Sequence, residues 1–212
     1  GDVYKRQDVF SDCLPVFEAA FADGKACDAM CSYNSIDSIP VSMDHELLTD
    51  VLRGQFGMPG FVRSDLTAVS RLYDWHFIAE TPEEAIRLGL EAGVDLQLYD
   101  FPHDVRQKAI AHLIESGSMK MSVLDTACRR VLRMKFALGL FENPYTDEKR
   151  ADKILRCPEH LATAEKIAEK SIVLLKNDGL LPIKKDLRSV AVIGPAADTV
   201  SYGDYTETRG RK

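Results

Sequence analysis

A short apolar run from Gly60 to Asp65, with the sequence GFVRSD, ends in a carboxylate. Met58-Pro59-Gly60 opens this run with a turn signal and a helical pattern follows it, which is typical of a buried parallel strand. In sheets and barrels of parallel strands, chemistry gathers at the carboxyl ends of the strands, and Asp65 falls at such an end. A carboxylate there can be a nucleophile, a metal ligand or a helix cap.

Arg63 lies two residues before Asp65, so the two side chains share one face of the predicted strand. A buried guanidinium needs an anionic or carbonyl partner. We therefore predict that Arg63 pairs with Asp95 on the next strand or with Asp65 itself, and so supports an ionised Asp65. The alternative is that a bulge or a twist at the strand end turns Arg63 toward the outer helices.

Composition limits what the chain can do. The 212 residues carry a net charge of -6, which disfavours a general nucleic-acid binder, and no apolar run approaches the roughly 20 residues that span a bilayer. The five cysteines show no paired spacing that would complete a zinc site, and we interpret them as small buried apolar residues. We expect no metal and no cofactor.

The first residue is not Met, and residues 1–7 show neither helical periodicity nor a capping pattern. We predict that this stretch is foreign to the protein. The sequence therefore leaves the localisation open between cytoplasm, periplasm and secretion.

Strand and helix patterns alternate along the chain. Thr81-Pro82-Glu83-Glu84 is a strong helix start, with a capping Thr, Pro in the first turn and Glu three residues after the cap; Ser122 with Asp125 is a weaker one. Helices are predicted over residues 8–23, 44–56, 82–92, 104–116, 122–138 and 158–176, and strands over 26–33, 61–65, 94–98 and 189–193. Such alternation predicts an α/β fold with a parallel sheet.

The rhythm breaks after residue 141, where a polar stretch over 142–157 is predicted to be a linker. Three strand-helix units precede the linker, whereas a closed barrel needs eight. We therefore expect a fragment that spans a domain boundary, with one domain over 8–141 and the start of another over 158–212.

Nine short segments give the chain a family resemblance. They are 30–35 (MCSYNS), 46–53 (ELLTDVLR), 60–65 (GFVRSD), 91–95 (EAGVD), 129–132 (RRVL), 138–141 (LGLF), 171–177 (SIVLLKN), 192–195 (VIGP) and 203–206 (GDYT). In this order and spacing they resemble glycoside hydrolase family 3. The resemblance covers nearly everything from Asp8 onward.

The resemblance implies a fold and an activity. Its usual plan is a (β/α)8-type barrel, a linker and an α/β sandwich domain, and this chain resembles the last three barrel units, the linker and the first helix and strand of the sandwich. The family hydrolyses terminal β-glycosides with retention, so the implied partner is a small or oligomeric β-glycoside. The implied enzyme is an exo-acting β-glucosidase.

The resemblance also implies roles for single residues. Asp65 matches the nucleophile, which would form a covalent glycosyl-aspartate, and Tyr33 matches a tyrosine that hydrogen-bonds to the nucleophile. Ends of adjacent parallel strands lie about 4.7–4.9 Å apart, so Tyr33 can reach Asp65, and a phenol donor favours the ionised carboxylate. The general acid/base is expected beyond Lys212, so the fragment alone should be inactive.

One departure from the family pattern concerns sugar stacking. The family usually has Trp directly after its nucleophile, whereas Leu66 stands there in this chain. Trp75 or Tyr73 in the same loop is a candidate substitute, and packing of the loop is the alternative role for both. Three further functions stay open: a β-xylosidase, an N-acetyl-β-glucosaminidase of the same family, or an inactive carbohydrate-binding relative.

Overall fold

The computed structural model describes residues 3–195, 197 and 198. The chain divides into two compact units, Gly1–Thr146 and Asp147–Lys212, and each is described by itself. The segment 203–206, which contributes to the family resemblance, lies outside the described residues. The predicted domain limits stay predictions.

A parallel sheet organises the first unit. Its strands are β2 (Ala29–Cys31), β5 (Val62–Ser64) and β6 (Val94–Leu96), in the order β2-β5-β6 with both pairings parallel. The predicted α/β fold with a parallel sheet is thus confirmed, although each strand is shorter than its predicted range. The central strand is the most deeply buried, with Val62 and Ser64 fully inaccessible to solvent. The residue after it is Asp65.

A second, small sheet was missed by the sequence patterns. Strand β1 (Val3–Tyr4) pairs in parallel with β3 (Ser35–Ile36), which pairs antiparallel with β4 (Ile39–Pro40). Asp37 and Ser38 both have positive φ, as a two-residue hairpin turn requires. The prediction that residues 1–7 are foreign stays a prediction, although a strand forms within them.

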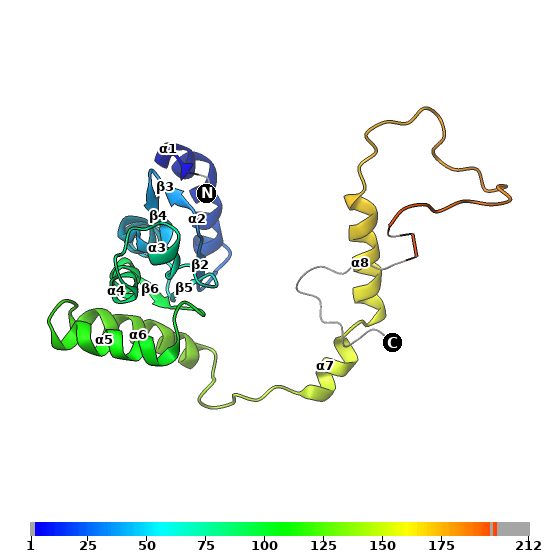
Figure 1. Cartoon of the computed structure of the whole chain (residues 1–212). Helices are drawn as coiled ribbons and strands as arrows, with labels where there is room; N and C mark the ends of the chain where they lie inside the picture. Colours follow the sequence, from blue (N-terminus) through cyan, green and yellow to red (C-terminus); the bar gives the residue numbers. More distant parts are fainter. Residues whose placement is uncertain (1–2, 196, 199–212) are drawn as a thin grey trace. The chain divides into compact units, whose positions relative to one another are not determined.

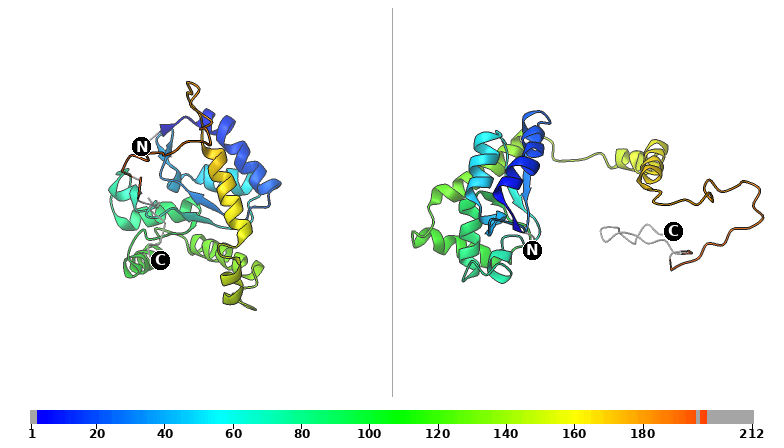
Figure 2. Two further views of the ribbon diagram at one scale, coloured as in Figure 1. Left: turned by 90° about the vertical axis from the view of Figure 1, so that its right-hand side faces the viewer. Right: turned by 90° about the horizontal axis from the view of Figure 1, so that it is seen from above.

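The predicted helix over 8–23 is realised as three consecutive helical segments, α1 (Arg6–Asp8), the π-helical η1 (Val9–Cys13) and α2 (Leu14–Ala22). Pro15, which has no N–H to donate inside this continuous helical stretch, lies in the first turn of α2, directly after the π-helical segment η1. This stretch packs on the π-helix η3 (Glu46–Gln55), which follows the short 3-10 helix η2 (Val41–Met43) (Figures 1 and 2).

Four further helices complete the first unit: α3 (Arg71–Asp74), α4 (Pro82–Ala92), α5 (His103–Glu115) and α6 (Met121–Ala137). The predicted limits of α4 are confirmed, because Thr81 Oγ1 accepts the backbone N–H of Glu84 at 3.1 Å and Gly93 ends the helix with φ 108°. The predicted N-cap of the helix over residues 122–138 is wrong. Helix α6 starts after Lys120 without a side-chain cap, so Ser122 lies inside it.

Two apolar clusters hold these elements together. The larger one joins the sheet to its flanking helices and contains Val62, Val94 and Leu72. The second fills the space among α4, α5 and α6, where Ile86, Leu113 and Ala127 are buried (Figure 1). None of the described helices is long and apolar enough to span a bilayer.

The second unit differs from its predictions in three places. The predicted linker contains a helix, α7 (Glu148–Ile154), capped by Asp147, whose carboxylate accepts the backbone N–H of Arg150. Helix α8 (Pro158–Ser171) ends five residues early, where Ile172 turns extended. Residues 189–193 form no strand, because no described strand of this unit pairs with them, and their apolar side chains are exposed.

Candidate functional site

Asp65 lies at the carboxyl end of the central strand, as the sequence predicts. Its backbone N–H donates to Cys31 O at 3.2 Å, which extends the β2–β5 pairing by one step. Its carboxylate oxygen Oδ1 accepts the N–H of Leu66 at 2.6 Å. Asp65 is half-buried and is therefore partly accessible to solvent.

Tyr33, from the end of the neighbouring strand, reaches the same segment. Its hydroxyl donates to the carbonyl of Leu66 at 2.5 Å, one residue beyond Asp65. His76, in the loop after Asp65, places Nε2 3.0 Å from the carbonyl oxygen of Tyr33. The structure thus gathers Tyr33, Leu66 and His76 at one edge of the sheet, while the predicted bond from Tyr33 to the Asp65 carboxylate stays a prediction.

The structure adds a carboxylate that sequence reasoning missed. Asp100 follows β6 and is buried, with 7% of its surface exposed. Its Oδ2 accepts the hydroxyl of Ser64 at 2.9 Å, and its Oδ1 accepts the backbone N–H groups of Val69 at 2.6 Å and Ser70 at 2.9 Å. The chain does contain a signal for it, because Asp100 ends an apolar strand pattern just as Asp65 does.

Burial affects the protonation of two groups near this edge. Burial raises the pKa of Asp100, against the opposing effects of its hydrogen bonds and the charge of Arg106. Burial also raises the pKa of the Cys31 thiol to about 12, and the negative charges of Asp100 and Asp65 add to that rise. The Cys31 thiol is therefore neutral at ordinary pH and acts as a packing group.

The predicted partner of Arg63 is wrong. Arg63 forms an ion pair with Asp28, just before β2, and both side chains are more than a third exposed. A register shift between Val62 and Arg63 interrupts the regular β5–β6 pairing at this position. Support of the nucleophile by Arg63 stays a prediction, and it now rests on a different partner.

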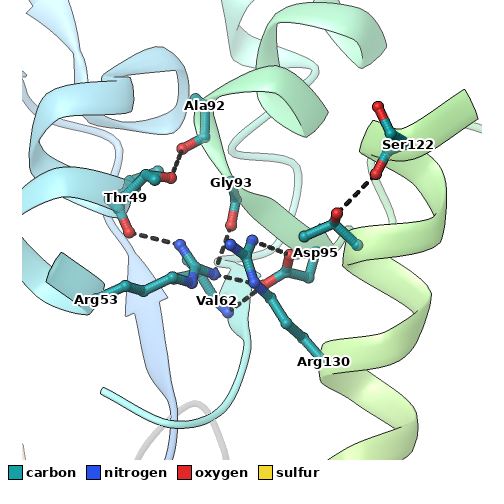
Figure 3. A network of polar contacts seen from close by, with 10 residues as sticks. Thr49, Arg53, Val62, Ala92, Gly93, Asp95, Ser122 and Arg130 are labelled. Atoms are coloured by element: carbon teal, nitrogen blue, oxygen red, sulfur yellow. Dashed lines mark hydrogen bonds and ion pairs between the residues drawn. The ribbon is translucent and has the colours of Figure 1, made fainter. Parts of the chain in front are cut away.

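Asp95 has other partners, shown in Figure 3. Its carboxylate accepts hydrogen bonds from Arg53 Nη2, from Arg130 Nη1 at 2.9 Å and from the backbone N–H of Val62 at 2.9 Å. Only 1% of the Asp95 side chain is exposed, so this is a buried ion-pair network. Because Val62 begins β5 and Asp65 follows its end, the network supports the strand from the end opposite the candidate nucleophile.

Trp75 lies in the loop after Asp65, at the end of α3. Its side chain is 56% exposed, and the guanidinium of Arg71 lies 5.2 Å from the ring centroid. Leu66 is also exposed, at 43%. An accessible aromatic ring in this loop is compatible with contact to a sugar face, and its role as a substrate-binding residue stays a prediction.

A half-buried carboxylate directly after a central parallel strand, with Tyr33 and His76 bound to the neighbouring backbone, is typical of α/β proteins that bind or transform ligands at strand ends. Comparison with known families narrows this class. The model described as "Glycosyl hydrolase family 3 N terminal domain" matches residues 2–134, and "Glycosyl hydrolase family 3 C-terminal domain" matches residues 172–210. The chain belongs to glycosyl hydrolase family 3.

Individual relatives agree with this assignment. A periplasmic beta-glucosidase of Salmonella typhimurium is 38% identical over 199 residues, which cover 91% of this chain and 25% of that protein. A beta-xylosidase of Formosa agariphila is 37% identical over 190 residues, 87% of this chain and 26% of that protein.

A solved structure is also similar. The beta-glucosidase from Listeria innocua in complex with glucose superimposes with a TM-score of 0.75 at 34% identity, over 86% of this chain and 25% of that one. The chain therefore spans about a quarter of the length of the relatives that it matches.

Proposed function

We propose that the protein to which this chain belongs is a retaining, exo-acting β-glycosidase, most closely a β-glucosidase. The observation that carries the proposal is Asp65, a half-buried carboxylate at the end of the central parallel strand in a chain of this family. In a retaining mechanism such a carboxylate attacks the sugar and forms a covalent glycosyl-enzyme, which water then hydrolyses.

Other residues receive supporting roles in this proposal. Tyr33 keeps the segment of Asp65 in place and favours the ionised carboxylate, while Trp75 contacts the sugar in place of the tryptophan that Leu66 replaces. The second carboxyl group, about 5–5.5 Å from the first in retaining enzymes, comes from outside this chain. The first unit is proposed to be the end of a (β/α)8-type barrel, and the second the start of an α/β sandwich domain.

A β-xylosidase is the second candidate. It is favoured by the beta-xylosidase of Formosa agariphila, whose identity to this chain nearly equals that of the Salmonella beta-glucosidase. The two sugars differ by one hydroxymethyl group, so the same nucleophile and the same mechanism serve both.

Covalent labelling tests the proposal. The complete protein is incubated with a fluorinated aryl β-glucoside and, separately, with the matching β-xyloside, both of which trap the glycosyl-enzyme. We expect a stable mass increase on the peptide that carries Asp65, larger in yield with the glucoside. The Asp65→Asn variant should stay unlabelled, and the control Asp74→Asn, which changes an exposed carboxylate at the end of α3, should label normally.

The labelling experiment with each sugar has an outcome that would contradict the proposal. A label on a different carboxylate would remove Asp65 from the mechanism, and faster labelling by the xyloside would replace the glucosidase with the xylosidase. The absence of any covalent adduct in the wild-type protein would contradict a retaining mechanism with this nucleophile.

A further inference from the structure

We propose that Asp100 is a positioning residue that fixes the backbone on both sides of Asp65. This inference rests on the proposed role of Asp65 as the nucleophile. It assigns a task to a buried carboxylate that has no part in the bond-making step itself.

Asp100 accepts hydrogen bonds from residues that lie before and after Asp65 in the sequence. On the strand side, Oδ2 accepts the hydroxyl of Ser64, the residue immediately before Asp65, at 2.9 Å. On the loop side, Oδ1 accepts the N–H groups of Val69 and Ser70, four and five residues after Asp65. One carboxylate therefore holds both ends of the turn that carries the candidate nucleophile.

Further bonds tie the same turn to the chain around Asp100. Ser64 Oγ, which donates to Asp100, also accepts the N–H of Leu98 at 2.7 Å, and the carbonyl of Leu98 accepts the N–H of Thr67 at 3.0 Å. Thr67 has φ 64°, a left-handed conformation that is costly for a branched residue and persists only where its surroundings hold it. The segment Leu98–Asp100 supplies that hold.

The chemistry of the acceptor explains why a carboxylate is needed. Asp100 accepts three hydrogen bonds, and the two N–H groups of Val69 and Ser70 share a single oxygen. An ionised carboxylate makes shorter and stronger bonds than a neutral acceptor does. The charge of Arg106 in α5 favours the ionised form of Asp100 and so opposes the effect of burial on its pKa.

Positioning of this kind affects the rate of the covalent step. A displacement of about 1 Å in a reacting group can cost roughly 10² in rate. Asp100 neither contacts the sugar nor exchanges a proton in this scheme. Its loss should therefore slow the attack by Asp65 and leave the binding of the sugar largely unchanged.

The test measures attack by Asp65 directly. In the complete protein, the rate of covalent labelling by a fluorinated aryl β-glucoside with a good leaving group is compared among wild type, Asp100→Asn and Ser64→Ala. We expect the maximal labelling rate to fall about 10²-fold in Asp100→Asn and about three- to tenfold in Ser64→Ala, with half-saturating concentrations within about twofold of wild type. The combined variant should lose less than the product of the two, since both act on one network.

The control is Asp104→Asn, which removes the same charge from the exposed first turn of α5, where the Asp104 carboxylate lies 3.5 Å from Lys108 Nζ. It should label at the wild-type rate. Circular dichroism and melting temperature show which variants are folded. Where Asp100→Asn fails to fold, Ser64→Ala decides the question alone.

The failures of the two proposals are distinguishable. Folded Asp100→Asn or Ser64→Ala protein that labels at the wild-type rate overturns the positioning role and leaves the proposed function intact, even where the melting temperature falls. A wild-type protein that does not label at Asp65 overturns the proposed function, and the positioning role falls with it.

Discussion

At the scale of single residues, Asp65 directly follows β5 and Asp100 lies four residues after the neighbouring strand β6, but their surroundings differ. Asp65 is half-buried, and the acceptor bond described for its carboxylate comes from the adjacent residue, Leu66. Asp100 is buried and accepts three bonds from residues more than 25 positions away. The accessible carboxylate suits chemistry, and the enclosed one suits support of the turn that carries it.

The raised pKa of Asp100 gives a prediction for stability. Because burial raises this pKa in the folded protein, the folded state holds its proton to a higher pH than the unfolded chain, where the pKa is about 3.9. The raised pKa therefore contributes fully to the free energy of unfolding at pH values below the unfolded pKa. This contribution is lost as the pH rises through the pKa of Asp100 in the folded protein. Asn does not titrate, so Asp100→Asn lacks this loss.

We thus expect the free energy of unfolding of Asp100→Asn, relative to wild type, to be least favourable below about pH 4 and to improve as pH rises. Urea unfolding of both proteins across a pH series measures this difference, with Asp104→Asn as the control. A difference that grows more unfavourable with rising pH would contradict the direction of the shift.

How much of the site the sequence predicts depends on the range of each interaction. The places of Asp65 and Tyr33 at strand ends follow from local apolar patterns, and the structure agrees. The partners of Arg63 and Asp95 depend on which side chains meet in the folded protein. The apolar pattern of the sequence carries no information on such contacts, so it did not indicate Asp28, Arg53 or Arg130. Asp100 was missed for the same reason, since its partners lie 30–36 residues away.

At the scale of elements, the Asp95 network joins η3, β5, β6 and α6 (Figure 3). Burial lowers the pKa of Arg53, against the opposing charge of Asp95. The charged form of the Arg53 guanidinium is thus disfavoured by burial and stabilised by the Asp95 carboxylate. The side chain of Arg53 is 10% exposed and that of Arg130 is 22% exposed, so both guanidinium groups are largely shielded from water.

We expect Asp95→Ala to destabilise the protein by about 3–5 kcal/mol, because it leaves two largely buried guanidinium groups uncompensated. The shift in the urea midpoint at constant slope measures the loss. Asp28→Ala, which removes the exposed partner of Arg63, is the matched control and should cost about 0–1 kcal/mol. Equal losses in the two variants would show that the Asp95 network is not a special support.

Helix prediction succeeded where the signals were local. Thr81, Pro82 and Gly93 define α4 through capping and a left-handed end, and both ends are confirmed. Prediction failed for 189–193, because an apolar run becomes a strand only where another strand pairs with it. The helix α7 inside the predicted linker was overlooked, although Asp147 provides a standard capping residue.

At the scale of the whole molecule, the chain spans about a quarter of the length of its relatives. Strand β2 lies at one edge of its sheet, and an apolar cavity of about 290 Å³ runs beside it, lined by Val9, Phe17 and Met30 among others. An open edge with apolar surroundings favours association with other chains. We expect the 212-residue chain expressed by itself to be prone to aggregation.

The isolated chain should also fail to hydrolyse an aryl β-glucoside. A retaining mechanism needs two carboxyl groups acting in turn, general acid assistance contributes a factor of about 10²–10⁴, and the proposed acid lies outside these residues. Release of the aryl alcohol is measured for the purified chain beside its Asp65→Asn variant. Release above that control would show that a working acid lies within the chain.

The long span of the Asp100 bonds has a consequence for biosynthesis. Helices such as α4 form from neighbouring residues, whereas the turn around Asp65 is complete only after the chain has been extended to Asp100 and β6 has joined the sheet. At about 5–20 residues per second, the ribosome takes roughly 2–7 s to add that stretch. During this interval β5 lacks its β6 partner, so the turn that carries Asp65 acquires its geometry later than a helix formed from neighbouring residues, such as η3.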